Sequence, residues 1–123
     1  MIIDDGGVKM DNVVADKRKS FAIRIIKFYK YLCDEKKEFI LSKQILRSGT
    51  SIGANIRESK NAQSKADFIS KMNIALKEAD ETAYWLELLW ESEIIEKSQV
   101  KDLYELNTEL IKLLTAIIKS SKK

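Results

Sequence analysis

Residues 44–56 read QILRSGTSIGANI, and the fold class depends on how this stretch is interpreted. Its isoleucines recur at helical spacing and give it one apolar edge. Gly49 and Gly53 are four residues apart, so in a helix they lie one above the other on a single face. Because each glycine inside a helix costs about 1 kcal/mol relative to alanine, we expect a compensating contact. The expected contact is a second helix packed so closely that a Cβ atom would clash, although the turn-like composition also allows a loop.

The composition favours one domain built from long helices. The chain has 123 residues, no proline and only four glycines, so little in it interrupts a helix. Cys33 is the single cysteine, which excludes an intramolecular disulfide and suits a reducing cytoplasm, where we expect the protein. We see no signal peptide and no apolar run long enough to cross a bilayer, so no membrane partner is expected.

Apolar periodicity predicts four helices. The first should start near Asp16, with residues 1–15 forming a flexible tail outside the helical domain of residues 16–123. The second should run from about Glu38 to Ser59, the third should open at the capping sequence SKAD of residues 64–67, and Ser98 should cap the fourth. Short connections between such helices predict an all-α, antiparallel, up-down-up-down four-helix bundle.

The apolar stripe of the third predicted helix is wider than a helical hairpin needs. Ile74, Trp85 and Leu88 fall to one side of its core stripe, which suggests a second buried side, against another subunit. The following residues are therefore predicted to pack helices together or to form an oligomer interface: Gly49, Ile52, Gly53, Ile74, Trp85, Leu88.

The residues needed for most enzyme chemistry are missing. The chain has no histidine, which removes the commonest general base and the commonest transition-metal ligand. It has no phosphate-binding glycine loop, and one cysteine cannot build a zinc site. Acidic residues around Glu78 and Glu81 are better explained as a solvated face paired with lysines than as a cation site. We therefore expect no catalytic residue, no metal and no cofactor.

Charge is unevenly distributed along the chain. Residues 17–61 hold twelve Lys or Arg and four Asp or Glu, a net charge of +8, whereas residues 62–96 hold three and eight, a net charge of −5. Phosphate groups bind such clustered cations, although solubility and salt bridges explain many basic patches equally well. If the first two helices are antiparallel neighbours, five cations could share one nucleic-acid-binding surface: Arg24, Lys27, Lys43, Arg47, Arg57.

Two long motifs carry a family resemblance. LSKQILRSGTSIGANIRES at residues 41–59 and AQSKADFISKMNIALKEADETAYWLELL at residues 62–89 resemble the four-helix-bundle proteins encoded in intervening sequences of bacterial 23S rRNA genes. The resemblance extends from about Ser20 to about Ile118. Many relatives read Asn-Ile-Glu-Glu-Ala where this chain has Asn55-Ile-Arg-Glu-Ser59, which adds positive charge.

The resemblance implies a non-enzymatic bundle that assembles as a ring-shaped pentamer. Similar bundles are accessory proteins of diversity-generating retroelements, where a basic surface meets nucleic acid and a reverse transcriptase. Our first hypothesis is an oligomeric RNA-binding accessory protein that uses the basic face of the first two helices. The alternative is a protein-interaction scaffold without a nucleic-acid ligand, which the wide apolar stripes and the glycine face would serve equally well.

Overall fold

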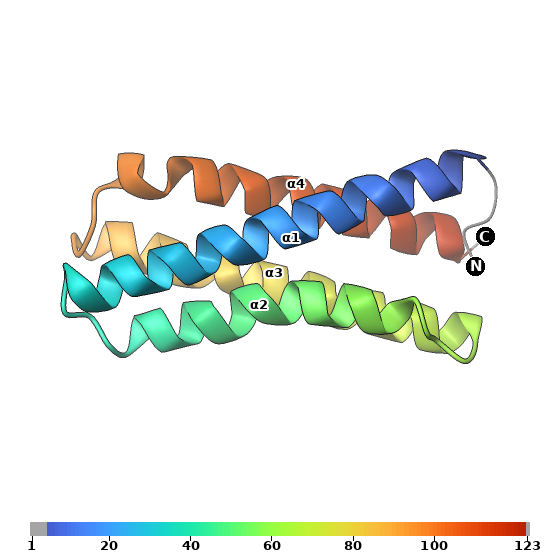
Figure 1. The fold of residues 1–123 in the computed structure, drawn as a ribbon, viewed down its shortest axis with the longest axis horizontal. Coiled ribbons are helices and arrows are strands. Elements are labelled where there is room, and N and C mark those ends of the chain that lie inside the picture. Colours follow the sequence, from blue (N-terminus) through green and yellow to red (C-terminus); the bar gives the residue numbers. More distant parts are fainter. Residues whose placement is uncertain (1–4, 123) are drawn as a thin grey trace.

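The chain folds into four long helices that lie side by side (Figure 1). The computed structural model describes the backbone of residues 5–122 and the side chains of residues 16–122. The helices are α1 (Asp5–Asp34), α2 (Leu41–Ser59), α3 (Lys65–Glu91) and α4 (Lys97–Ser121). Short connections join them, and no strand occurs in the described part of the chain.

Neighbouring helices run in opposite directions. Among the described residues α1 contacts α2 and α4, and α3 contacts α2 and α4, so the order around the bundle follows the chain. Along α1 and α2, Cys33 lies by Ser42 whereas Ile25 lies by Gly49, as antiparallel neighbours require. Figure 1 shows the same alternation for all four helices. The all-α four-helix bundle expected from the sequence is thus confirmed.

The first helix starts earlier than the sequence pattern indicated. We expected it to begin near Asp16, but α1 begins at Asp5. Residues 6–15 contain no proline, and helical backbone can continue through them without an apolar stripe because the helix is already nucleated downstream. Residues 1–4 of the predicted tail lie outside the described residues, so its flexibility stays a prediction.

The other helix starts use polar side chains near the predicted positions. The Glu38 carboxylate accepts hydrogen bonds from the backbone N–H groups of Ile40, Leu41 and Ser42 at 2.7–3.2 Å, so α2 begins three residues later than expected. This carboxylate also suits the positive end of the α2 dipole. The Ser64 hydroxyl accepts from the Asp67 N–H, as the capping sequence predicted.

The start of α4 differs from the expectation that Ser98 caps it. Glu96 occupies the N-cap position, and its backbone N–H donates to the Gln99 side chain at 2.9 Å. Serine is intrinsically the better cap, but Gln99 three residues after Glu96 supplies the returning half of a capping box.

The core is a mainly apolar column between the four helices, with a few buried polar side chains. Its fully buried members include the following side chains: Phe21, Ile25, Leu32, Ile45, Ile52, Leu86, Leu89, Val100, Leu110, Leu114. Buried polar side chains between helices are placed in pairs or bonded to backbone. The hydroxyls of Ser48 and Thr82 lie 2.8 Å apart between α2 and α3, and Asn107 Nδ2 donates to the Ala79 carbonyl at 2.8 Å between α4 and α3.

Helix α3 ends without a glycine. Glu93 has a φ of 67°, and its N–H donates to the Trp90 carbonyl while the Ile94 N–H donates to the Leu89 carbonyl. This pair of bonds is a Schellman motif, in which glycine usually occupies the left-handed position. The chain therefore turns at Ser92 and Glu93, directly after α3, and α4 starts a few residues later at Lys97.

Candidate nucleic-acid interface

The glycines of α2 face α1. A Cβ atom built on Gly49 would lie 2.8 Å from Cδ1 and Cγ1 of Ile25, and one on Gly53 would lie 2.7 Å from Cγ of Arg18. Real Cβ atoms essentially never approach other atoms so closely. Gly49 is buried and Gly53 half-buried, so the two positions differ in how easily the neighbour can move. The close helix contact expected at this face is made by α1 of the same chain.

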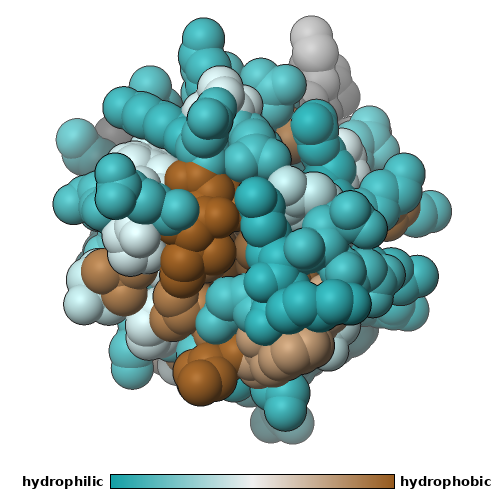
Figure 2. All heavy atoms as spheres, turned by 90° about the vertical axis from the view of Figure 1, so that its left-hand side faces the viewer, coloured by the Kyte–Doolittle hydropathy of each residue, from teal (hydrophilic) through white to brown (hydrophobic). Residues whose placement is uncertain are grey.

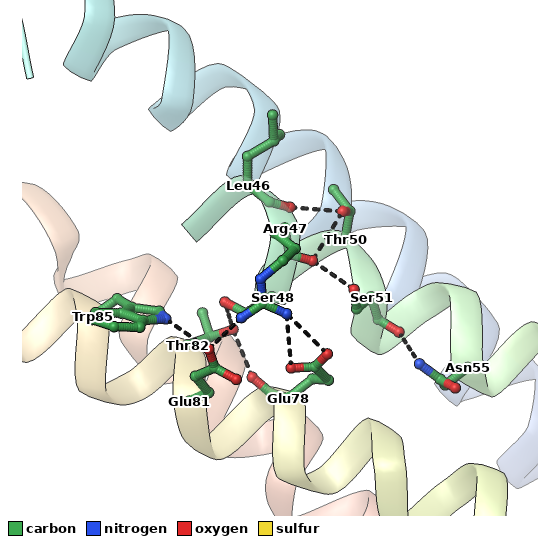
Figure 3. A network of polar contacts seen from close by, with 10 residues as sticks. All are labelled: Leu46, Arg47, Ser48, Thr50, Ser51, Asn55, Glu78, Glu81, Thr82 and Trp85. Atoms are coloured by element: carbon green, nitrogen blue, oxygen red, sulfur yellow. Dashed lines mark hydrogen bonds and ion pairs between the residues drawn. The ribbon is translucent and has the colours of Figure 1, made fainter. Parts of the chain in front are cut away.

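Arg47 turns toward α3, where two carboxylates hold it (Figure 3). Its Nη1 lies 3.3 Å from Glu78 Oε2, and its Nη2 forms a second ion pair with Glu81. Glu81 also accepts the indole N–H of Trp85 at 3.2 Å. Figure 3 shows this network next to the Ser48–Thr82 pair, which is buried. Arg47 therefore links α2 to α3. The acidic residues form ion pairs, as the sequence suggested, but with an arginine and not with the expected lysines.

The two candidate cations of α1 lie on its other side, toward α4. Arg24 Nη2 is 4.0 Å from Asp102 Oδ2, a loose and exposed ion pair. Arg24 and Lys27 line a shallow hollow together with Ser98 and Asp102 at the beginning of α4. Surface ion pairs of this kind typically contribute less than about 1 kcal/mol, so Arg24 remains able to change partner.

Lys43 and Arg57 project from the outside of α2, and Lys27 is exposed on α1. No carboxylate among the described side chains lies within ion-pair distance of these three cations. They are the members of the predicted set whose charge is least compensated inside the chain.

The five predicted cations do not form one continuous face. The groove between α1 and α4 lies opposite the groove between α2 and α3, because the helices follow one another around the bundle. Arg24 and Arg47 point into these opposite grooves, so our expectation of a single shared surface needs correction. The physical reason is helical phase: a sequence spacing places residues on a face of a helix, but only packing decides where that face points.

Sequence reasoning missed a second group of basic and aromatic residues, where α3 ends and α4 begins. Trp90 and Tyr104 meet edge to face with ring centroids 5.1 Å apart, and Lys97 Nζ lies 5.4 Å from the Trp90 centroid. Lys101 and Glu105 complete the walls of a hollow of about 430 Å³. The available signal was the recurrence of Lys97, Lys101 and Tyr104 at three- and four-residue steps on one helix.

A hydrogen bond fixes the orientation of Tyr104. Its hydroxyl donates to Glu87 Oε2 at 2.7 Å, and this carboxylate, together with partial burial, raises the pKa of the Tyr104 phenol above its ordinary value. The hydrogen bond to Glu87 therefore restrains the Tyr104 ring at the hollow that it lines.

The predicted interface residues divide into two groups. Ile52 is fully buried in the core, and Gly49 and Gly53 face α1 of the same chain, so these three residues pack helices together within one chain. Ile74 is 40% exposed, and Trp85 and Leu88 are half-buried on the outside of α3. These three leave apolar surface available on α3, with the exposed Tyr84 beside Trp85.

The described residues contain no cluster of three or more acidic, cysteine or histidine side chains arranged to hold a metal ion. None of the described helices combines the length and apolar character needed to span a membrane.

These features define an all-helical bundle protein with dispersed surface cations and an aromatic hollow. The chain belongs to the family of 23S rRNA-intervening sequence proteins, whose sequence profile matches residues 10–116. It is also similar to a crystal structure of a protein of unknown function from the S23 ribosomal protein family of Bacteroides thetaiotaomicron VPI-5482. The two sequences are 62% identical, the match covers 89% of this chain and 98% of the other, and the TM-score is 0.87. A search among curated proteins found no match.

Proposed function

We propose that this protein is a non-enzymatic RNA-binding accessory protein that acts as a homo-oligomer in the bacterial cytoplasm. The observation that carries the proposal is the uncompensated charge on the outside of α1 and α2. Lys27, Lys43 and Arg57 are exposed there and have no carboxylate partner among the described side chains. Cations that have already found partners, such as Arg47, contribute little to such a surface.

Exposed cations attract the phosphate backbone without reading sequence, even where they are dispersed over two helices. Each phosphate that a protein neutralises releases counterions, so affinity falls as salt rises, with a slope of about 0.7 per contact on single strands. The family name, which refers to an intervening sequence of 23S rRNA, agrees with an RNA context. Catalysis is not part of the proposal, because the chain has no histidine and Glu38, Glu78 and Glu81 serve a helix start and ion pairs.

The test is the salt dependence of RNA binding. In the triple variant Lys27→Ala, Lys43→Ala and Arg57→Ala, the slope of log affinity against log salt should fall by about 2 if all three contact phosphate. A matched triple variant removes the same charge elsewhere, at the exposed residues Lys77, Lys112 and Lys119. Equal binding by both triple variants, or no binding of RNA by the unaltered protein at low salt, would exclude the proposed surface.

A pentamer is the assembly that the family resemblance suggests. The partly exposed apolar surface of Ile74, Trp85 and Leu88 on α3 is our candidate interface between subunits. Sedimentation or light scattering of the unaltered protein and of an Ile74→Glu variant tests this point. The mass should fall in the variant; a monomeric unaltered protein would refute oligomer formation.

The second candidate function is a protein-interaction scaffold, and one specific observation favours it. Figure 2 shows an apolar strip on the end of the bundle that carries the α1–α2 and α3–α4 connections. Phe39 and Ile40, in the first of these connections, are 53% and 76% exposed. A Phe39→Ser and Ile40→Ser variant should keep RNA binding if the first proposal is correct, and should lose a protein partner if the scaffold is correct.

A further inference from the structure

The hollow beside Trp90 combines two kinds of group that single-stranded nucleic acid uses. The planes of the Trp90 and Tyr104 rings meet at 73°, edge to face, and we call this pair the aromatic corner. The Glu87 carboxylate holds Tyr104, and the Schellman turn places Trp90 at the end of α3. This aromatic corner is therefore preorganised, and ordering it would cost little on binding.

Cations line the rim of the same hollow. Lys97 lies over the Trp90 ring, and Lys101 follows one helical turn later on α4. Glu105 is the one acidic residue among the described residues that line the hollow. The volume of the hollow, about 430 Å³, lies within the usual range of small-molecule sites, about 300–1,000 Å³.

A second hollow, lined by cations of α1, adjoins this one. Ser98, in the first turn of α4, lines both this hollow and the neighbouring one that contains Arg24 and Lys27. A strand that crosses α4 at Ser98 would thus meet Lys97 and Lys101 on one side and the α1 cations on the other. Asp102 partly compensates the second group through its 4.0 Å contact with Arg24.

We propose that the Trp90–Tyr104 corner binds one unpaired base of single-stranded RNA, with Lys97, Lys101 and the α1 cations on the flanking phosphates. This inference rests on the proposed RNA-binding function and adds where and in which form the RNA is recognised. Stacking on an aromatic ring needs an exposed base face, which a single strand offers and an RNA duplex does not. The base displaces the Lys97 ammonium from Trp90, and the lysine moves to the adjacent phosphate.

Tryptophan fluorescence tests the stacking directly. In a Trp85→Phe variant, Trp90 is the single tryptophan, and in a Trp90→Phe variant Trp85 is. Single-stranded oligoadenylate should quench the fluorescence of the first variant strongly and that of the second weakly. The duplex of oligoadenylate with oligouridylate, and the base-free polyanion polyglutamate, should leave Trp90 fluorescence nearly unchanged.

Affinity measurements separate this inference from the proposed function. A Trp90→Leu variant, and a Lys97→Ala and Lys101→Ala double variant, should each bind oligoadenylate about tenfold more weakly. The charge-matched control is Lys77→Ala and Lys112→Ala, at exposed residues outside the hollow. If single-stranded RNA binds but Trp90 is not quenched, or the lysine variant behaves like its control, the base-binding corner is refuted while RNA binding stands. If no RNA binds the unaltered protein, both proposals fail.

Discussion

Replacing Gly49 by alanine tests the close approach of α1 and α2. Alanine at a helix-interior glycine normally stabilises a protein by about 1 kcal/mol through helix propensity. At Gly49, however, the new Cβ would lie 2.8–2.9 Å from three side-chain carbons of Ile25. Ile25 is fully buried, so it can yield only by disturbing the core. Overpacking of this kind costs about 1–3 kcal/mol, so Gly49→Ala should lower the free energy of unfolding by up to about 2 kcal/mol.

Gly53→Ala is the matched comparison, on the same helix face. Its nearest neighbours are Cγ and Cδ of Arg18, at 2.7 and 3.3 Å, which belong to a long and partly exposed side chain. Cγ lies near the base of Arg18, and Nη1 at its far end is buried, so Arg18 must also shift. Because Arg18 is partly exposed, its shift should cost less than that of the fully buried Ile25, and Gly53→Ala should be the more stable variant by about 1 kcal/mol. Urea unfolding followed by circular dichroism measures both free energies.

A double-mutant cycle identifies the clashing atoms. Ile25→Ala removes all three carbons near the new Cβ and should itself cost about 2–5 kcal/mol. In that background Gly49→Ala should change sign and stabilise by up to about 1 kcal/mol. The steric reasoning is wrong if Gly49→Ala is as stable as Gly53→Ala in the unaltered protein. It is also wrong if Gly49→Ala still lowers the free energy of unfolding in the Ile25→Ala background.

Three further predictions concern buried or fixed polar groups. Thr82→Val should lower the free energy of unfolding by about 1–3 kcal/mol and Ser48→Ala by about 0.5–1.5 kcal/mol, since the first leaves the Ser48 hydroxyl buried without its partner; equal costs in urea unfolding would contradict this. Asn107→Leu should leave stability unchanged or raise it, because Oδ1 is buried without a hydrogen-bond partner in the described structure; a loss above about 2 kcal/mol would show that its bond to α3 outweighs that cost. Glu87→Gln should lower the pKa of Tyr104 in an ultraviolet titration, because the carboxylate that raises it is gone; an unchanged titration would refute the assignment. Since the pKa is raised in the folded state, the Tyr104–Glu87 hydrogen bond stabilises the fold below the ordinary phenol pKa, and this stabilisation is lost as pH rises through the folded value.

Much of the helical architecture follows from the sequence because apolar spacing and caps are local. The isoleucine spacing through Gly49 predicted α2, and the capping sequence at Ser64 predicted the start of α3. The start of α1 was missed because residues 5–15 show no apolar period and contain Gly6 and Gly7, while the helix, nucleated downstream and free of proline, continues through them. At α4, the capping box of Glu96 and Gln99 was overlooked in favour of the stronger cap residue Ser98.

Sequence alone determined that the chain is an all-helical bundle, that it lacks histidine-based chemistry and that its first half is strongly basic, because composition and period-3.6 patterning record these properties directly. Only the tertiary structure decided which cations have partners. Arg47 lies against Glu78 and Glu81, and Arg24 against Asp102, because the phase of each helix in the bundle sets the direction of its side chains. The same packing brought Trp90 and Tyr104 together from two helices, a contact that no spacing along one helix encodes.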